Sequence, residues 1–399
     1  MIVLDDLCLN IVDCLHKTAP INELGNYFAV GTPAMRGNSI DYSLARRIDD
    51  ITFDEWTKRL RPRYGDLLLA REAPVGPVVR IPIEENVAPG QRTVLLRPDT
   101  AKVISDYLYY LLIAPEQQER LNQPIGGSTV AHLNVADVRS FRLPDVPSLM
   151  EQRRIAGMLG ALDDKIESNC AQQRIGEQLL RAVIEGILGQ FSEADFISFD
   201  AYCTQSKESV RPENIGNGDK YIALEHMPRG SVFLNSWETA KLAGIASNKT
   251  RFRHGDLLFG KLRPYFKKVG VAPVSGVCST DILVIRPRLP EFLPFIAVIA
   301  SSDALIDSIS ASATGTRMPR ASWKEIATWP VPQIPDETLT VLLHPANQLM
   351  AFLETLSLQN LKLAQLRDAL LPELMSGRMR VDEAERLVTE ALDEEVADV

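Results

Sequence analysis

Two clusters of basic side chains suggest a ligand for this chain of 399 residues. Residues 251–268, RFRHGDLLFGKLRPYFKK, hold six Lys or Arg against one Asp, and residues 58–63, KRLRPR, hold four and no acid. Ammonium and guanidinium groups bind phosphate, and guanidinium also pairs with the edge of guanine, so such clusters are typical of nucleic-acid contacts. A solvated charged face is the alternative for either cluster taken alone.

The overall charge does not argue against a polyanionic ligand once its distribution is considered. The formal net charge is −9, but residues 380–399 hold eight acids against two arginines, a net of −6 that leaves −3 for the rest. The acidic charge is therefore concentrated at the carboxyl end, away from both basic clusters.

Sequence motifs of catalysis are missing. An amino-methyltransferase would need an Asn/Asp-Pro-Pro-aromatic loop and a glycine-rich cofactor loop, and neither occurs. The five histidines form no HExxH pattern, and the five cysteines form no CxxC pair, so the sequence predicts no metal site and no disulfide framework. We expect a protein that binds and does not catalyse, with free buried thiols.

The basic clusters belong to an internal repeat. RYGDLLL (63–69) matches RHGDLLF (253–259), YFAV (27–30) matches YIAL (221–224), and LLRP (95–98) matches VIRP (284–287). Residues 127–147 also align without a gap with residues 315–335. The offset drifts only from 194 to 188 positions, which predicts a duplicated domain with small loop insertions.

A long helix is predicted after each repeat. Both segments carry apolar residues at spacings of three and four, the seam of a coiled coil, and Gly377 is placed to end the second helix. A polar residue on such a seam usually fixes the register, which is the role expected of Asn360. The predicted seam consists of Ile155, Leu159, Leu162, Ile166, Leu349, Leu353, Leu356, Asn360 and Leu363.

These patterns predict an α/β (α+β) fold: two homologous mixed α/β domains separated by two long antiparallel coiled-coil helices, with a pseudo-twofold internal repeat. The predicted parts are residues 1–148, 149–190, 191–336, 337–380 and an acidic tail, 381–399. No run reaches the roughly 18 apolar residues of a membrane span, and the amino terminus lacks a basic signal region, so we expect a cytoplasmic protein without membrane contact.

Three stretches carry a family resemblance. EQRRIAGMLGALDDKIESN (151–169), STDILVIRP (279–287) and LRDALLPELMSGRMRV (366–381) resemble the specificity subunit of type I restriction-modification enzymes. The resemblance extends from about residue 13 to residue 381 and leaves the acidic tail unmatched. No single motif decides it; the combination of duplicated domains with duplicated helices does.

The resemblance implies function and partners. Each domain would be a target-recognition domain that reads one half of a split site in double-stranded DNA, and the helices would dock two modification (methyltransferase) subunits, with restriction or translocase subunits as further candidate partners. The chain would need no cofactor, because S-adenosylmethionine would bind the methyltransferase subunit. The alternatives are a coiled-coil adaptor that binds proteins, a stand-alone enzyme with a degenerate site, and the recognition subunit of a related bifunctional restriction system.

Candidate DNA contacts are side chains in loops between strand-like runs that offer directed hydrogen bonds or positive charge. For Lys268 and Lys267 we expect phosphate contact rather than base reading. The candidates in the first domain are Lys17, Thr18, Arg36, Asn38, Arg71, Ser128, Thr129 and His132, and those in the second are Lys207, Arg229, Lys261, Arg263, Tyr265, Lys267, Lys268, Thr316, Arg317 and Arg320.

Overall fold

The computed structural model describes residues 1–123, 132–191, 195–312 and 319–397. These residues form two compact units, each described by itself below. The first unit comprises Met1–Asp163 and Gln365–Val399, and the second comprises Asp164–Ala364. The first unit is therefore built from both ends of the chain.

The first unit is organised around a four-stranded sheet in the order β2-β10-β7-β8. Its central strands are continuous apolar runs, LLLAR and TVLLRP, and their side chains are buried except that of the partly exposed Arg97. Such runs are typical of strands covered on both faces. The elements are β1 (Ile2–Val3), α1 (Leu4–Leu7), β2 (Cys8–Asp13), β3 (Tyr27–Val30), β4 (Met35–Arg36), β5 (Ser39–Ile40), β6 (Arg46–Ile48), α2 (Asp50–Trp56), β7 (Leu67–Arg71), β8 (Val75–Arg80), β9 (Val87–Pro89), β10 (Thr93–Pro98), α3 (Ser105–Ile113), α4 (Pro115–Leu121), α5 (Val135–Arg139) and β11 (Arg142–Leu143).

The second unit has a sheet of the same kind, in the order β13-β21-β18-β19. A five-stranded sheet, β14-β17-β20-β15-β16, completes it. The elements are β12 (Phe196–Ser198), η2 (Phe199–Ala201), β13 (Cys203–Ser206), β14 (Ser209–Val210), β15 (Lys220–Ile222), β16 (Glu238–Thr239), β17 (Lys249–Phe252), β18 (Leu257–Gly260), η5 (Pro264–Phe266), β19 (Val269–Val271), β20 (Gly276–Cys278), β21 (Ile282–Pro287), α7 (Leu293–Ala300), α8 (Asp303–Ser312), α9 (Trp323–Ala327) and β22 (Pro330–Pro332).

The two strand orders correspond position by position, which confirms the predicted internal repeat. β3 pairs parallel with β9 in the first unit, and β15 pairs parallel with β20 in the second. The short helices α5 and α9 both begin with a capping box, formed by Asn134 with Asp137 and by Ser322 with Glu325. The Asp137/Glu325 match in the sequence repeat is therefore a helix start that both units share.

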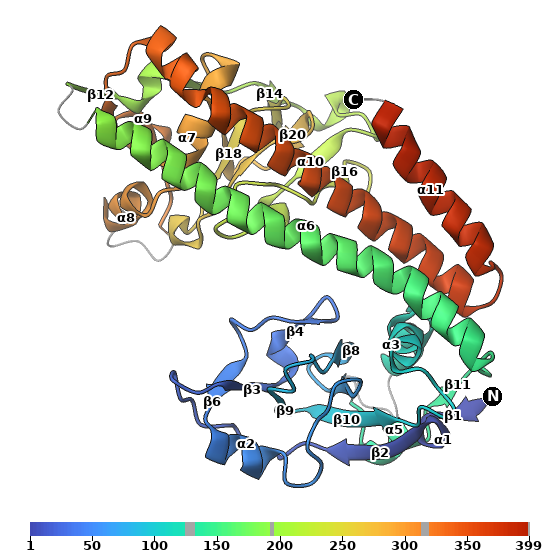
Figure 1. Ribbon diagram of the computed structural model, residues 1–399. Helices are drawn as coiled ribbons and strands as arrows, with labels where there is room; N and C mark the ends of the chain where they lie inside the picture. Colours follow the sequence, from blue (N-terminus) through green and yellow to red (C-terminus); the bar gives the residue numbers. More distant parts are fainter. Residues whose placement is uncertain (124–131, 192–194, 313–318, 398–399) are drawn as a thin grey trace. The chain divides into compact units, whose positions relative to one another are not determined.

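Two long helices, α6 (Leu149–Gln190) and α10 (Asp336–Met375), contribute residues to both units. In Figure 1 they are the green and the orange-red helices. Within the second unit they run antiparallel: Asn169 Nδ2 donates to Gln359 Oε1 over 3.4 Å, and Gln173 Nε2 donates to the Leu353 carbonyl over 3.2 Å. As the residue number rises on α6, that of its partner falls on α10. The predicted antiparallel pairing of two long helices is confirmed.

The seam is buried along both helices. Asn360 is 7% exposed, and its Nδ2 lies 3.3 Å from Cys170 Sγ. Ile166 and Leu349 are half-buried. At Gly176 the helices approach closely, because a β-carbon there would collide with the side chain of Leu353. The remaining predicted seam residues are buried: Ile155, Leu159, Leu162, Leu353, Leu356 and Leu363.

The segment predicted as an acidic tail contains a helix, α11 (Val381–Ala397), which belongs to the first unit. Val381 and Ala384 on its inner face are 1% and 0% exposed, and the carboxylate of Asp382 forms an ion pair with Arg154 of α6. The segment forms a packed helix rather than a solvent-exposed tail because its apolar residues are spaced by three, which gives an otherwise acidic helix one face to bury.

Among the described residues, no single helix is long and apolar enough to cross a membrane. Two segments joined by a bend, Pro290–Ala300 and Asp303–Ala311, meet the length and composition test only as a pair. Most of the first segment is buried in the core of the second unit.

Candidate nucleic-acid interface

The duplicated GDLL motif forms a buried ion pair in each unit. Asp66 is 3% exposed and accepts hydrogen bonds from Arg97 Nε and Nη2 over 2.9 and 2.7 Å. Asp256 is 2% exposed and accepts from the same atoms of Arg286, both over 2.7 Å. These bonds raise the pKa of both guanidinium groups above its ordinary value. The repeated motif is thus a framework element that joins β10 to β7 and β21 to β18.

The same aspartates also hold the turn before each strand. Asp66 Oδ2 accepts from the backbone N–H of Arg63 over 2.9 Å, and Asp256 Oδ2 accepts from that of Arg253 over 2.8 Å. The glycine of each motif has a positive φ, 89° and 78°, which a side chain would disfavour. The basic residues beside the motif therefore flank a structural turn.

The opposite end of the second unit's sheet carries a basic hairpin, residues 261–268, between β18 and β19. Arg263 and Lys267, on either side of η5, have φ values of 49° and 50°. Non-glycine residues in this left-handed region are strained, and such strain is concentrated at functional sites. The strained backbone makes this hairpin the leading candidate for a binding element.

Phe266 is the centre of this hairpin. The guanidinium carbons of Arg229 and Arg263 lie 4.0 and 5.9 Å from its ring centroid, and the ring of Tyr265 lies 4.8 Å away at 67°. Cations over an aromatic face are attracted to it, so the ring orders two mobile guanidinium groups. Tyr265 itself is 50% exposed. The result is a fixed group of donors at the protein surface.

The other cations of the hairpin are engaged in local contacts. Lys261 Nζ donates to the Thr280 carbonyl over 2.5 Å, and Lys267 forms an ion pair with Asp303. Lys268 donates to the Leu224 carbonyl, and burial together with the nearby Arg229 lowers the pKa of its ammonium group. Lys268 is therefore a weaker candidate for a phosphate contact than Lys267.

Two further candidates lie at this end of the second unit's sheet. Leu262 forms an isolated bridge with Arg320, whose side chain is 61% exposed and lies 3.3 Å from Asp281. Lys207 is exposed and directly follows β13, whose last residue pairs with Val284 of β21. Strand register thus brings Lys207 to the end of the sheet where β18 continues into the hairpin.

The equivalent hairpin of the first unit is short and lacks the cations. β7 ends at Arg71 and β8 begins at Val75, whereas β18 and β19 are separated by residues 261–268. Ala73, with a φ of 50° before Pro74, stands where the second unit has Arg263 before Pro264. Both residues have a positive φ before a proline, but only Arg263 carries a guanidinium group.

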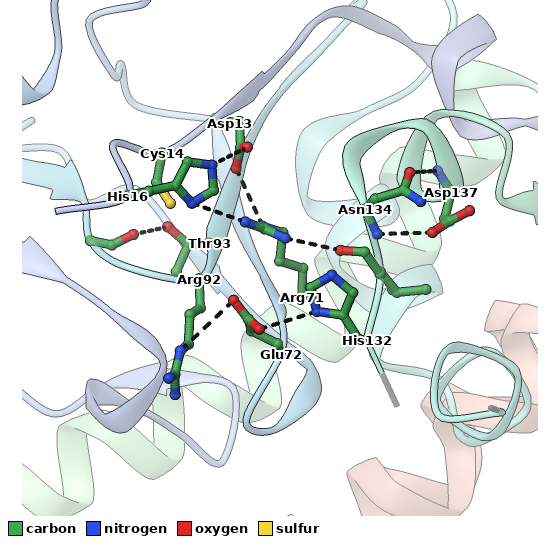
Figure 2. A network of polar contacts seen from close by, with 12 residues as sticks. Asp13, Cys14, His16, Arg71, Glu72, Arg92, Thr93, His132, Asn134 and Asp137 are labelled. Atoms are coloured by element: carbon green, nitrogen blue, oxygen red, sulfur yellow. Dashed lines mark hydrogen bonds and ion pairs between the residues drawn. The ribbon is translucent and has the colours of Figure 1, made fainter. Parts of the chain in front are cut away.

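A polar network takes the place of exposed cations in the first unit (Figure 2). Arg71 is at its centre: the side chain is 6% exposed, and Nε lies 3.3 Å from Asp13 Oδ1. Its Nη2 lies 3.3 Å from His16 Nδ1, and its Nη1 donates to the Leu133 carbonyl over 3.2 Å. The prediction that Arg71 contacts DNA does not fit this geometry, because the guanidinium group is buried and engaged.

Exposed candidates surround this network. Lys17 and Thr18 are exposed in the segment after β2, and His132 is exposed with Nδ1 3.1 Å from Glu72 Oε2. Arg36 is exposed on the β4–β5 hairpin. Asn38 is half-buried, and its Oδ1 accepts from the backbone N–H of Val78 over 3.1 Å, so its amide fixes that hairpin to β8.

Comparisons with known proteins show which proteins the chain resembles. Residues 23–175 match the type I restriction modification DNA specificity domain. The chain is 24% identical over 367 residues to the type I restriction enzyme MjaIX specificity subunit of Methanocaldococcus jannaschii, covering 85% of this chain and 83% of the relative. It is 23% identical over 307 residues to the EcoDI specificity subunit of Escherichia coli, covering 67% of each. The chain is therefore similar to type I restriction enzyme specificity subunits, and residues 23–175 carry the match to their DNA specificity domain.

A solved structure agrees with the fold. The type I restriction-modification S subunit from M. genitalium superposes with a TM-score of 0.59 at 16% identity, over 94% of this chain and 95% of that one. The likeness extends over both units, so the two structures share the duplicated fold.

Four candidate DNA contacts lie outside the described residues: Ser128, Thr129, Thr316 and Arg317.

Sequence reasoning missed most of the network around Arg71. Asp13, His16, Glu72 and Arg92 all take part, and Glu72 lies between Arg92 Nε at 3.8 Å and His132 Nδ1 at 3.1 Å. Alignment of the two copies of the repeat could have indicated this network, because Glu72 aligns with the apolar Leu262. A carboxylate at a position that is apolar in the other copy indicates a local network.

Proposed function

We propose that this chain is a type I specificity subunit that binds double-stranded DNA and that each unit reads one half of a bipartite site. The proposal rests on the equivalent ends of the two four-stranded sheets, which have the same strand order. In the second unit this end carries a cationic, aromatic hairpin, and in the first it carries a network of carboxylate, histidine and arginine side chains. Two readers with one framework and different surface chemistry are suited to two half-sites of different sequence.

In the second unit, Arg263, Arg229 and Tyr265 would approach the bases, and Lys267 would bind a phosphate. Arg263 is exposed, and both guanidinium groups are held at Phe266. A guanidinium group held in one plane can form the bidentate contact with guanine that discriminates base pairs. Lys267 is paired with an exposed aspartate, Asp303, and can exchange this partner for a phosphate oxygen.

In the first unit, Lys17, Thr18 and His132 would form the reading surface. Lysine supplies charge, threonine can contact either kind of base, and histidine can donate or accept. All three are exposed and lie in segments that meet at Arg71. The first half-site is thus read with fewer cations than the second.

The long helices would dock two methyltransferase subunits. Ile175 and Leu179 on α6 are 63% and 54% exposed, four residues apart and so on one face. Phe352 on α10 is 50% exposed. Such apolar side chains on a helix exterior fit a protein partner. The partner would bring S-adenosylmethionine and the chemistry, and the subunit would act in the cytoplasm without a cofactor of its own.

Mapping methylated bases in cells with and without the gene tests this proposal. We expect one two-part sequence motif, with a fixed gap, to lose methylation when the gene is removed. A protein-binding adaptor would leave the methylation pattern unchanged. Purified chain should also bind random duplex DNA with an affinity that falls steeply with salt, by about 0.9 log unit per phosphate contact for each decade of salt.

A further inference from the structure

Arg71 lies where three segments of the first unit meet (Figure 2). Asp13 ends β2, His16 lies in the segment after it, and Leu133 lies in the segment that leads to α5. The three nitrogens of one guanidinium group reach all of them, at 3.3, 3.3 and 3.2 Å. The two segments that carry Lys17, Thr18 and His132 are therefore tied to one side chain.

The contact with Leu133 is made from two sides. Its carbonyl accepts from Arg71 Nη1, and its N–H donates to the Arg71 carbonyl over 3.0 Å. The next residue, Asn134, begins α5 by accepting from the N–H of Asp137 over 3.0 Å. Residues 132–134 are thus held by strand, side chain and helix cap together.

The second unit has the backbone contact without the clamp. Ala321 N–H donates to the Lys261 carbonyl over 2.9 Å, as Leu133 does to Arg71. The Lys261 amine bonds instead to the carbonyl of Thr280. An ammonium group has no planar fork and cannot replace the two hydrogen bonds and the ion pair that the Arg71 guanidinium group forms. The clamp is therefore a feature of the first unit's reading surface.

We propose that Arg71 is the positioning residue of the first half-site reader. It stays buried when DNA binds and fixes the distance between the Lys17–Thr18 segment and the His132 segment. Glu72 supports the arrangement from the next position by bonding His132 and facing Arg92. This inference rests on the proposed function, since it requires that the first unit reads DNA.

The test compares full-length chains on a pool of duplexes with randomised base pairs, followed by sequencing of the bound fraction. Arg71→Met removes the clamp, and Arg71→Lys keeps the charge without the fork. We expect Arg71→Met to reduce base preference in one half-site by about tenfold and to leave the other half-site unchanged. Arg71→Lys should recover part of this preference. Binding to non-specific duplex should keep its salt slope, because no phosphate contact is lost.

Arg97→Lys is the matched control, because it weakens another buried arginine–aspartate pair of the same unit, away from the reading segments. It should lower the thermal midpoint and preserve both half-site preferences. The inference is overturned if Arg71→Met keeps the full base preference or relaxes the preference in both half-sites. It is also overturned if Arg71→Met lowers the salt slope by about 0.9, because Arg71 would then be a phosphate contact. If the wild-type chain enriches no sequence, the proposed function fails instead.

Discussion

The strand end after β18 in the second unit and the one after β7 in the first share two backbone features and differ in side-chain chemistry. At the first position of the connection, Lys261 and Arg71 both accept a hydrogen bond from the segment before a short helix. Two positions later, Arg263 and Ala73 both have a positive φ and precede proline. One connection is lengthened and cationic, whereas the other is short and its arginine is buried.

This comparison distinguishes the structural framework that both units share from the surface residues proposed to read DNA. The parts that match are the buried pairs Asp66–Arg97 and Asp256–Arg286, the glycine turns and the strand order. The parts that differ are surface side chains at one end of each sheet. A shared scaffold with exchangeable loops allows one fold to address unrelated sequences, because phosphate contacts orient the protein and a few side chains read bases.

The largest expected effect tests the shared framework. Asp66→Asn and Asp256→Asn should each lower the free energy of unfolding of the affected unit by about 3 kcal/mol, because each leaves a partly buried arginine without its carboxylate. Urea denaturation measures this. The control is Asp106→Asn, whose half-exposed pair with Arg80 should contribute under about 1 kcal/mol. If either framework variant is no more harmful than the control, the two units do not share this anchor.

The next prediction tests the difference between the hairpins. Arg263→Ala should weaken binding by about 1 to 3 kcal/mol and relax one base pair of the second half-site, because a bidentate contact is lost. Titration against a panel of single-substituted duplexes measures this. Arg251→Ala, in the same basic segment but on β17, is the control and should preserve the base preference. A loss that is uniform across the panel would make Arg263 a phosphate contact.

A smaller effect concerns the two asparagines that the repeat relates, Asn169 and Asn360. Both are buried on the seam, 0% and 7% exposed, so Asn→Leu at either site should raise the free energy of unfolding of the second unit by roughly 1 kcal/mol while loosening the helix register. Denaturation and hydrogen exchange along α6 measure the two effects. Exposed Gln172→Leu is the control. A loss of stability in both asparagine variants would contradict a register role.

The smallest effect distinguishes neighbouring lysines of the hairpin. Lys267→Ala should reduce the salt dependence of DNA binding by about 0.9 log unit per decade, the value for one phosphate. Lys268→Ala should leave the slope unchanged, since this side chain is half-buried and bonds to the Leu224 carbonyl. Binding measured from low to moderate salt decides between them. Equal slopes for the two variants would show that neither lysine contacts a phosphate.

The repeat and the long helices could be predicted because both are periodic patterns in local sequence. The DNA-facing role of Arg71 could not be judged from sequence, because a strand end and a loop start look alike until the register of β2, β7 and β10 is known. That register brings Asp13 beside Arg71 across 58 positions. The backbone strain at Arg263 and Lys267 could not be predicted from the sequence either, because neither residue type favours a positive φ.

The first unit's division between the two ends of the chain has a consequence for synthesis. The second unit, Asp164–Ala364, is contiguous, whereas the first requires the last 35 residues of the chain. At about 5 to 20 residues per second, roughly 10 to 40 s separate the emergence of residue 163 from that of residue 365. During that interval Arg154 and Asp163 of α6 lack their carboxyl-terminal partners, Asp382 and Arg367. The unit whose synthesis begins first is therefore the last to be completed.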